Sequence, residues 1–218
     1  MKLPYQYIVL EGNIGAGKTS LATRMANEFN IRLVQEHFSD NPFLPLFYEN
    51  PQRHAFSLEL FFLAERYQQL KDNIAEQDIF QQQTVSDYIL SKSLVFAKTN
   101  LGESEFSLYH RLFHIIHSHI PKPDLLIYLH KDIQVLLKNI SKRGRQYELG
   151  IESEYLKKIE EGYWEFFRQQ SGYPILVIDT NDLDYVNNEE DYRKIISLLS
   201  KKYSSGIHRI SFGEENTF

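Results

Sequence analysis

Gly12-Asn13-Ile14-Gly15-Ala16-Gly17-Lys18-Thr19 is the stretch that decides the fold of this chain. It matches the pattern G-x-x-x-x-G-K-S/T of a P-loop, whose backbone wraps around phosphate groups. The apolar run Tyr7–Leu10 before it is typical of a buried strand, and Thr19–Phe29 carries apolar residues at helical spacing. A glycine turn between a strand and a helix N-terminus directs several backbone N–H groups to one point. The stretch therefore predicts a nucleoside triphosphate site.

The chemistry of this motif assigns roles to its side chains. Lys18 is expected to reach the β- and γ-phosphates, and the hydroxyl of Thr19 is expected to bind Mg²⁺. The motif alone does not distinguish a kinase from a switch or a motor. The candidate ATP ligands in this stretch are Gly12, Asn13, Ile14, Gly15, Ala16, Gly17, Lys18, Thr19 and Ser20.

Length and composition narrow the class of protein. A chain of 218 residues is long enough for one α/β domain, which we expect to span residues 1–218. Cysteine is absent, which excludes disulfides and thiolate chemistry, and a net charge of −5 argues against a broad nucleic-acid surface. The N-terminal residues form no secretion signal, and the longest apolar runs, such as Leu125–Leu129, are too short to span a bilayer. We expect a soluble, cytoplasmic protein without nucleic-acid or membrane partners.

Predicted strands alternate with predicted helices along the chain, which indicates an α/β fold with a five-stranded parallel sheet covered on both faces. The expected strands are Tyr7–Leu10, Arg32–Gln35, Thr84–Ser86, Leu125–Leu129 and Ile175–Ile178. Besides Thr19–Phe29, the expected helices span residues 54–77, 106–120, 133–142, 153–170 and 189–203. The tail after Ser204 is weakly patterned, so residues 204–218 are assigned no element.

Acidic residues follow two of the predicted strands. Glu36 comes after the second strand and Asp87 after the third. Ligands of parallel sheets bind at the carboxyl ends of the strands, so both side chains are expected beside the P-loop. Phosphoryl transfer to an alcohol uses a carboxylate that accepts the hydroxyl proton, and oxygen ligands that hold Mg²⁺. Either acid taken alone also fits an ordinary turn or capping residue.

A second basic feature lies in Lys142–Glu148, where Arg143 and Arg145 flank Gly144. Planar guanidinium groups suit a γ-phosphoryl group whose charge spreads during transfer. A solvated helix end also favours cations, so this interpretation has an ordinary alternative.

Over nearly its whole length the chain resembles the deoxynucleoside kinase family, which includes deoxyguanosine, deoxyadenosine and deoxycytidine kinases. The resemblance rests on the P-loop, Glu36, residues 41–44, 47–51, 55–67, 86–88, 93–98 and 121–124, and Arg143-Gly144-Arg145-x-x-Glu148. It implies a P-loop kinase fold with an arginine-rich lid at about residues 143–151. It also implies ATP as the donor, Mg²⁺, a deoxynucleoside acceptor, nucleotide salvage and a homodimer.

The resemblance also implies site residues. Glu36 matches the general base that deprotonates the 5′-hydroxyl, and Tyr48 matches the tyrosine that binds the sugar 3′-hydroxyl, with Glu148 as its acidic partner. Arg66 matches an arginine at the nucleobase edge, and Asp182 lies in a segment that resembles the loop around the adenine of ATP. The implied catalytic set is Glu36, Lys18, Arg143 and Arg145; the implied acceptor set is Glu36, Tyr48, Glu59, Arg66, Asp87 and Glu148; and Thr19 and Asp87 are the metal ligands.

Three positions depart from the pattern of the family. Tyr88 stands where many relatives carry an arginine near the 5′-hydroxyl, so either another cation substitutes or the acceptor site is arranged differently. Glu59 stands at a frequent glutamine, and Ser93 at a frequent aspartate. Glu59 lies two helical turns before Arg66 on the same face, so we expect it to pair with that arginine.

The preferred base stays open between two purines. A carboxylate accepts hydrogen bonds only, so Glu59 by itself favours the two N–H groups of guanine. The similarity to bacterial purine-type relatives places deoxyadenosine slightly ahead of deoxyguanosine. Two other functions also remain: a nucleoside monophosphate kinase, and a non-catalytic P-loop nucleotide-binding module.

Residues 106–120 carry two further patterns. Leu108, Leu112, Ile115 and Ile116 form an apolar stripe, which fits either a homodimer contact or the core of the chain itself. His110, His114 and His117 lie at helical spacing, which is more typical of solvated residues than of metal ligands.

Overall fold

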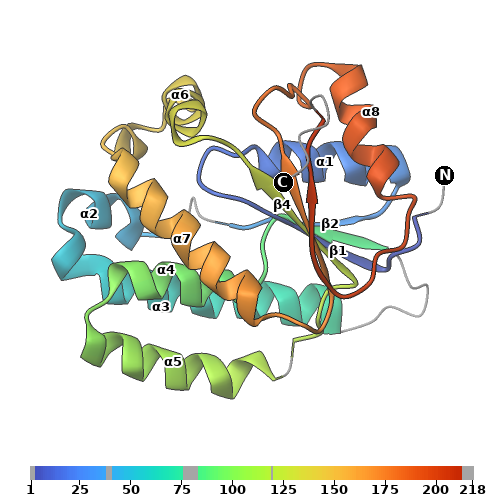
Figure 1. Ribbon diagram of the computed structural model, residues 1–218. Coiled ribbons are helices and arrows are strands. Elements are labelled where there is room, and N and C mark those ends of the chain that lie inside the picture. The colour runs from blue at the N-terminus through green and yellow to red at the C-terminus, as the bar shows by residue number, and fades with distance from the viewer. Residues whose placement is uncertain (1–2, 38–40, 76–82, 119, 213–218) are drawn as a thin grey trace.

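A parallel sheet of six strands runs through the centre of the molecule (Figure 1). The computed structural model describes residues 3–37, 41–75, 83–118 and 120–212. Within these residues the strand order is β2-β3-β1-β4-β5-β6, and every pair of neighbours is parallel. The strands are β1 Tyr7–Glu11, β2 Arg32–Val34, β3 Thr84–Ser86, β4 Leu125–His130, β5 Pro174–Asp179 and β6 Gly206–Ile210.

Helices cover both faces of the sheet (Figure 1). They are α1 Lys18–Phe29, α2 Phe43–Glu49, α3 Pro51–Leu70, α4 Lys92–Asn100, α5 Glu103–His117, α6 Ile133–Arg143, α7 Ser153–Gln169 and α8 Glu189–Leu198. One core cluster joins α1, α6 and α8 to the sheet, and another joins α4 and α7 to it. Helices α3, α4 and α5 share a third cluster. Figure 1 shows α5 farther from the sheet than α4.

Alternation along the central strands decides which side chain enters which core. In β4, Leu125, Ile127 and Leu129 pack in the cluster of α1 and α8. Leu126 and Tyr128 of the same strand pack against α7 on the opposite face. Successive side chains of a strand point to opposite faces, and both faces here are covered, so the strand is a continuous apolar run.

The sheet has one strand more than the sequence predicts. Strand β6 lies in the tail that was assigned no element, and it pairs with β5 from Pro174↔Gly206 to Ile178↔Ile210. It is an edge strand with one neighbour, and its residues are half-buried or exposed. Such a strand needs no apolar run, so its pattern is too weak to indicate a strand.

Two helices were missing from the prediction, for different reasons. Helix α2 is short and contains Pro45, and the side chain of Asn50 caps α3 directly after it. Helix α4 buries residues on several sides because it packs against α3, α5 and α7, so it lacks the one-sided apolar stripe that indicates a surface helix.

Other helix bounds differ by a few residues. Helix α3 starts at Pro51 and ends at Leu70, followed by a π-helical turn over Lys71–Ala75, whereas residues 54–77 were predicted. Positions 76 and 77 of that prediction lie outside the described residues. Helix α5 lies three residues earlier than predicted, and α8 ends five residues earlier. None of the described helices is both long and apolar enough to cross a membrane.

Candidate active site

The P-loop connects β1 to α1 and is held by contacts that leave little room for side chains. Gly15 and Gly17 have φ angles of +85° and +88°, in the left-handed region that favours glycine. A Cβ atom on Gly15 would lie 2.8 Å from the carbonyl oxygen of Leu136, and one on Gly17 would lie 2.8 Å from the hydroxyl of Tyr185. The backbone is therefore fixed in the curved form that suits an anion.

Lys18 lies in the first turn of α1 and folds back over this loop. Its ammonium group donates to the carbonyl oxygens of Gly12 at 2.8 Å and Asn13 at 3.1 Å. Burial and the positive charge of Lys92 lower the pKa of Lys18 to about 8, although nearby acidic groups partly oppose the shift. A phosphate group close to this lysine would restore its ordinary affinity for a proton.

Asp87 connects three segments at the end of β3. One of its carboxylate oxygens accepts a hydrogen bond from the hydroxyl of Thr19, and the other accepts one from the backbone N–H of Glu36 at 2.7 Å. The ends of β2 and β3 and the start of α1 therefore meet at one carboxylate. This is the location that strand order predicts, since β1 and β2 both pair with β3.

A cavity of about 950 Å³ opens beside the P-loop. Its wall includes every predicted site residue except Gly12 and Asn13 at the start of the loop. The fold thus brings the predicted donor and acceptor residues to one space. The predicted residues in this wall are Ile14, Gly15, Ala16, Gly17, Lys18, Thr19, Ser20, Glu36, Tyr48, Glu59, Arg66, Asp87, Arg143, Arg145, Glu148 and Asp182.

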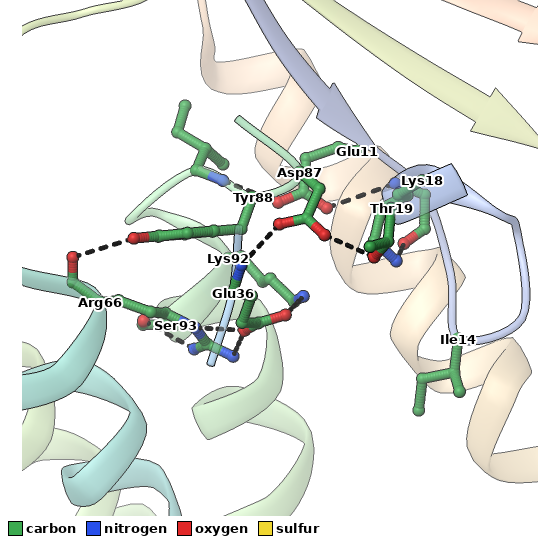
Figure 2. A network of polar contacts seen from close by, with 12 residues as sticks. Glu11, Ile14, Lys18, Thr19, Glu36, Arg66, Asp87, Tyr88, Lys92 and Ser93 are labelled. Atoms are coloured by element: carbon green, nitrogen blue, oxygen red, sulfur yellow. Dashed lines mark hydrogen bonds and ion pairs between the residues drawn. The ribbon is translucent and has the colours of Figure 1, made fainter. Parts of the chain in front are cut away.

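Glu36 lies between two cations deep in this cavity (Figure 2). The Nε and Nη2 atoms of Arg66 each lie 2.7 Å from its Oε1 atom, and the ammonium group of Lys92 lies 2.7 Å from Oε2. Burial alone would raise the pKa of Glu36, but the charges of Lys92 and Arg66 outweigh burial and hold that pKa well below its usual range. Glu36 is therefore a carboxylate at any physiological pH.

The side chain of Tyr88 points away from this cavity. It is fully buried, and its hydroxyl donates to the side chain of Gln69 at 3.0 Å. The sequence left two explanations for the missing arginine: another cation replaces it, or the acceptor site is arranged differently. Lys92 is a candidate for that cation, because its ammonium group enters the cavity from the first turn of α4. Lys92 was not among the predicted site residues, since the helix that carries it was not predicted.

Glu59 does not pair with Arg66 as expected. The ion-pair partner of Arg66 is Glu36, and its Nη1 atom donates to Ser93 at 2.9 Å. Glu59 instead accepts a hydrogen bond at Oε1 from the side-chain amide of Asn100 at 2.6 Å, and its buried Oε2 atom has no partner among the described residues. Burial raises the pKa of Glu59 to about 7, against the opposing charge of Arg66.

One carboxylate holds the two predicted lid arginines, which lie at the end of α6 and directly after it. Arg143 and Arg145 both form ion pairs with Glu148, which lies in a short 3-10 turn and is 5% exposed. The ring of Tyr147 stacks on that of Tyr48 with centroids 5.9 Å apart. Burial, followed by the charge of Glu148, raises the pKa of Tyr48, so the predicted tyrosine and acid lie near each other.

The family model for deoxynucleoside kinases matches residues 8–203 of this chain. The chain belongs to the deoxynucleoside kinase family.

Curated relatives extend this match over most of the kinase. A deoxyguanosine kinase of Bacillus subtilis strain 168 is 36% identical over 193 residues, which is 87% of this chain and 93% of the relative. A deoxyadenosine kinase of Lactobacillus acidophilus is 31% identical over 211 residues, or 90% of this chain and 96% of the relative. The kinase is thus a transferase that phosphorylates deoxynucleosides.

A solved structure shows the same fold. The deoxyadenosine kinase of M. mycoides with bound dCTP aligns with a TM-score of 0.76 at 24% identity. The alignment covers 88% of this chain and 98% of that structure.

Glu11 is a buried acid of the kinase that sequence reasoning missed. It accepts hydrogen bonds from the hydroxyl of Tyr163 at 2.7 Å, the backbone of Ile89 at 2.9 Å and the backbone of Gly12 at 3.2 Å. It thus ties the base of the P-loop to α7 and to the segment after β3. The sequence did offer a signal, because Glu11 directly follows the apolar run of β1. A carboxylate at such a buried position needs several hydrogen-bond donors.

The histidines of α5 form no metal centre within the part of the kinase that the structure describes. His110 and His114 approach at 3.1 Å, whereas His117 stacks on Phe113. No group of three or more potential ligands is found among the described residues.

Proposed function

We propose that this kinase transfers the γ-phosphoryl group of ATP to the 5′-hydroxyl of a purine deoxynucleoside in nucleotide salvage, with Mg²⁺ present. One observation carries the proposal: the P-loop, the half-buried carboxylate of Glu36 and the buried carboxylate of Glu59 line a single cavity. Donor phosphates and an uncharged acceptor can therefore meet in one space. The residues of the P-loop, Asp182 and the two lid arginines are assigned to the donor.

The lid arginines have a carboxylate partner that the reaction can replace. Arg143 and Arg145 are held by Glu148, which is assigned to the sugar of the acceptor together with Tyr48. Phosphate oxygens form charge-assisted bonds with guanidinium groups as carboxylates do. Binding of both substrates would thus move the arginines from Glu148 to the donor.

The oxygen atoms of Thr19 and Asp87 beside the P-loop are suitable ligands for a magnesium ion. Thr19 offers a hydroxyl oxygen and Asp87 a carboxylate oxygen, and the two are in contact. Mg²⁺ prefers such hard oxygen ligands and completes its shell with water and phosphate oxygens. When bound, the ion neutralises charge on the donor phosphates. Asp87 also holds the backbone of Glu36, so it positions the acceptor side of the site as well.

Asp87→Asn should weaken the response to Mg²⁺ more than it lowers the rate at saturation. The amide keeps one oxygen but loses the charge that attracts the cation. The measurement is kcat against Mg²⁺ concentration, with Asp72→Asn as the matched control, because Asp72 lies in the turn after α3 and lines no part of the cavity. An unchanged half-saturating Mg²⁺ concentration in Asp87→Asn would remove Asp87 from the metal site.

Glu59 and Asn100 are suited to discriminate between purines. The Oε2 atom of Glu59 has no partner in the part of the chain that the structure describes, and burial raises the pKa of Glu59 to about 7. The ionised form only accepts hydrogen bonds, which fits the N1–H and N2–H groups of guanine. The neutral form both donates and accepts, which fits N1 and the N6 amino group of adenine. These properties support a purine acceptor, and the balance between the two purines would depend on pH.

The ratio of kcat/KM for deoxyadenosine to that for deoxyguanosine should therefore fall as the pH rises through about 7. Below that pH the protonated carboxyl favours adenine, and above it the carboxylate favours guanine. Glu59→Gln should flatten the pH dependence and keep the ratio at its low-pH level, because an amide donates and accepts at every pH. Glu65→Gln on the same helix is the control, since Glu65 does not line the cavity. A ratio in Glu59→Gln that follows the wild-type curve would place Glu59 outside the acceptor pocket.

The decisive test of function is ATP consumption with each of the four deoxynucleosides and their monophosphates, in the presence of Mg²⁺. Turnover with deoxyadenosine and deoxyguanosine supports the proposal. Turnover with monophosphates alone would favour the nucleoside monophosphate kinase, and turnover with none would favour a non-catalytic module.

We extend the proposal to assembly and location, with a homodimer in the cytoplasm. Leu108 and Ile115 on α5 are 41% and 67% exposed, so this helix offers apolar area to a second copy. Sedimentation velocity of the wild type and Ile115→Glu tests the dimer.

A further inference from the structure

Lys92 is a buried cation in the cavity, and the proposed function gives it no part in the reaction. The residue is 5% exposed, and its ammonium group lies 2.7 Å from the Oε2 atom of Glu36. Among the described residues Glu36 is the only hydrogen-bond partner of this ammonium group, and the ring of Phe96 lies 5.5 Å from the Nζ atom. An ammonium group can donate three hydrogen bonds, so two donors remain in a residue that lines the cavity.

Holding Glu36 in place does not require this second cation. Arg66 already meets the Oε1 atom of Glu36 through two nitrogen atoms, and Ser93 fixes the guanidinium group in turn. Figure 2 shows Lys92 approaching Glu36 from the other side, so the carboxylate lies between the two cations. Lys92 therefore brings a positive charge to the face of Glu36 that Arg66 leaves open.

Lys92 and Lys18 lie close enough to repel each other. After burial, the charge of Lys92 is the largest cause that lowers the pKa of Lys18. Both residues line the same cavity. Glu36 and Asp87 partly offset this repulsion, and a further anion between the two ammonium groups would offset it more. This arrangement suits a group that carries several negatively charged oxygen atoms, such as a phosphoryl group. Each lysine would then contact a different oxygen atom.

We propose that Lys92 is a catalytic residue that contacts the transferred phosphoryl group opposite Lys18, while its bond to Glu36 brings the carboxylate to the acceptor hydroxyl. The proposal rests on the proposed function, since it places that hydroxyl at Glu36. A hydroxyl bonded to Glu36 lies near any ammonium group bonded to the same carboxylate. The charge of Lys92 is therefore located where negative charge develops during transfer.

The atoms of the step balance without a change in Lys92. The 5′-oxygen forms a bond to the γ-phosphorus, and the bond from that phosphorus to the β,γ-bridging oxygen breaks. ADP leaves, and the hydroxyl proton passes to Glu36. Lys92 keeps its proton and stabilises the oxygen atoms of the phosphoryl group throughout.

Lys92→Met tests this role because methionine fills the space without a charge. We expect kcat to fall roughly 10²–10³-fold, as for the loss of one donor to a transition-state oxygen. The Kd of the deoxynucleoside, measured by calorimetry, should change only a few-fold. A second readout is the pH profile: without Lys92 the pKa of Glu36 rises, so kcat of the variant should fall towards acidic pH where that of the wild type stays level.

The control is Lys98→Met on the same helix, because Lys98 pairs with Glu165 at the surface and should leave kcat unchanged. Lys92→Gln keeps a hydrogen-bond donor for Glu36 without the charge, and it decides the question if Lys92→Met does not fold. A kcat within about threefold of wild type in either variant would overturn the proposal, as would a loss explained wholly by weaker deoxynucleoside binding. Failure of the proposed function is distinct, since the wild type itself would then phosphorylate no deoxynucleoside.

Discussion

Replacing Lys18 with alanine is expected to lower kcat/KM for ATP by several orders of magnitude. The ammonium group lies at the mouth of the P-loop, where it donates to the carbonyl oxygens of Gly12 and Asn13. In the reaction it is expected to turn to the β- and γ-phosphates, whose charge it stabilises in a buried and weakly screened setting. Steady-state kinetics with saturating deoxynucleoside measure the loss.

A pH dependence accompanies this effect. The pKa of Lys18 is about 8 without nucleotide, so the lysine loses its charge as the pH rises through that value. KM for ATP of the wild type should therefore rise above about pH 8, and Lys18→Met should lack that rise. Lys157→Ala on the exposed side of α7 is the control for general effects of losing a lysine. Near-normal turnover in Lys18→Ala would contradict the assignment of the P-loop.

Glu36→Gln is expected to lower kcat by roughly 10²–10⁴-fold, or about 3–5 kcal/mol, which is the usual contribution of a general base. Glutamine keeps the shape and a hydrogen-bond acceptor but cannot take the hydroxyl proton. Positioning and charge stabilisation supply most of the rate in phosphoryl transfer, so the variant should retain measurable activity. The low pKa of Glu36 also makes it a weak base, which favours the lower part of this range.

Arg66 and Lys92 add a second consequence of this substitution. Removal of one partner from a buried ion pair costs about 3–5 kcal/mol, because a charge stays buried without compensation. Thermal unfolding and the Kd of the deoxynucleoside must therefore be measured beside kcat. Glu49→Gln at the exposed end of α2 is the control. If Glu36→Gln keeps its kcat and Asp87→Asn abolishes it at saturating Mg²⁺, the roles of the two acids are reversed.

Local patterns were sufficient for the central strands and the P-loop. Tyr7–Leu10 and Leu125–Leu129 are continuous apolar runs because both faces of their strands are covered, and both were predicted within one residue of the observed ends. The glycines of the loop need φ angles that other residues rarely adopt, so their chemistry is visible in one short stretch. Strand ends next to the loop then placed Glu36 and Asp87 in the correct region.

Patterns were insufficient at the edge of the sheet and in a helix that packs on several sides. Strand β6 lies at the sheet edge and keeps exposed residues, whereas α4 packs against three other helices and buries polar as well as apolar residues. Neither element shows the period that distinguishes a strand or a helix in sequence. Without α4, Lys92 and Asn100 had no place from which to enter the site.

The sequence by itself indicated the P-loop, the order of the central elements along the chain and many of the polar residues that line the cavity. Only the tertiary structure decided which charges pair within it. Helical spacing made Glu59 a neighbour of Arg66, but Glu36 arrives from the end of β2 and takes that arginine, while Asn100 arrives from α4 and takes Glu59. Ion pairs depend on distances of a few ångström between segments far apart in the chain, and spacing along one helix cannot supply those distances.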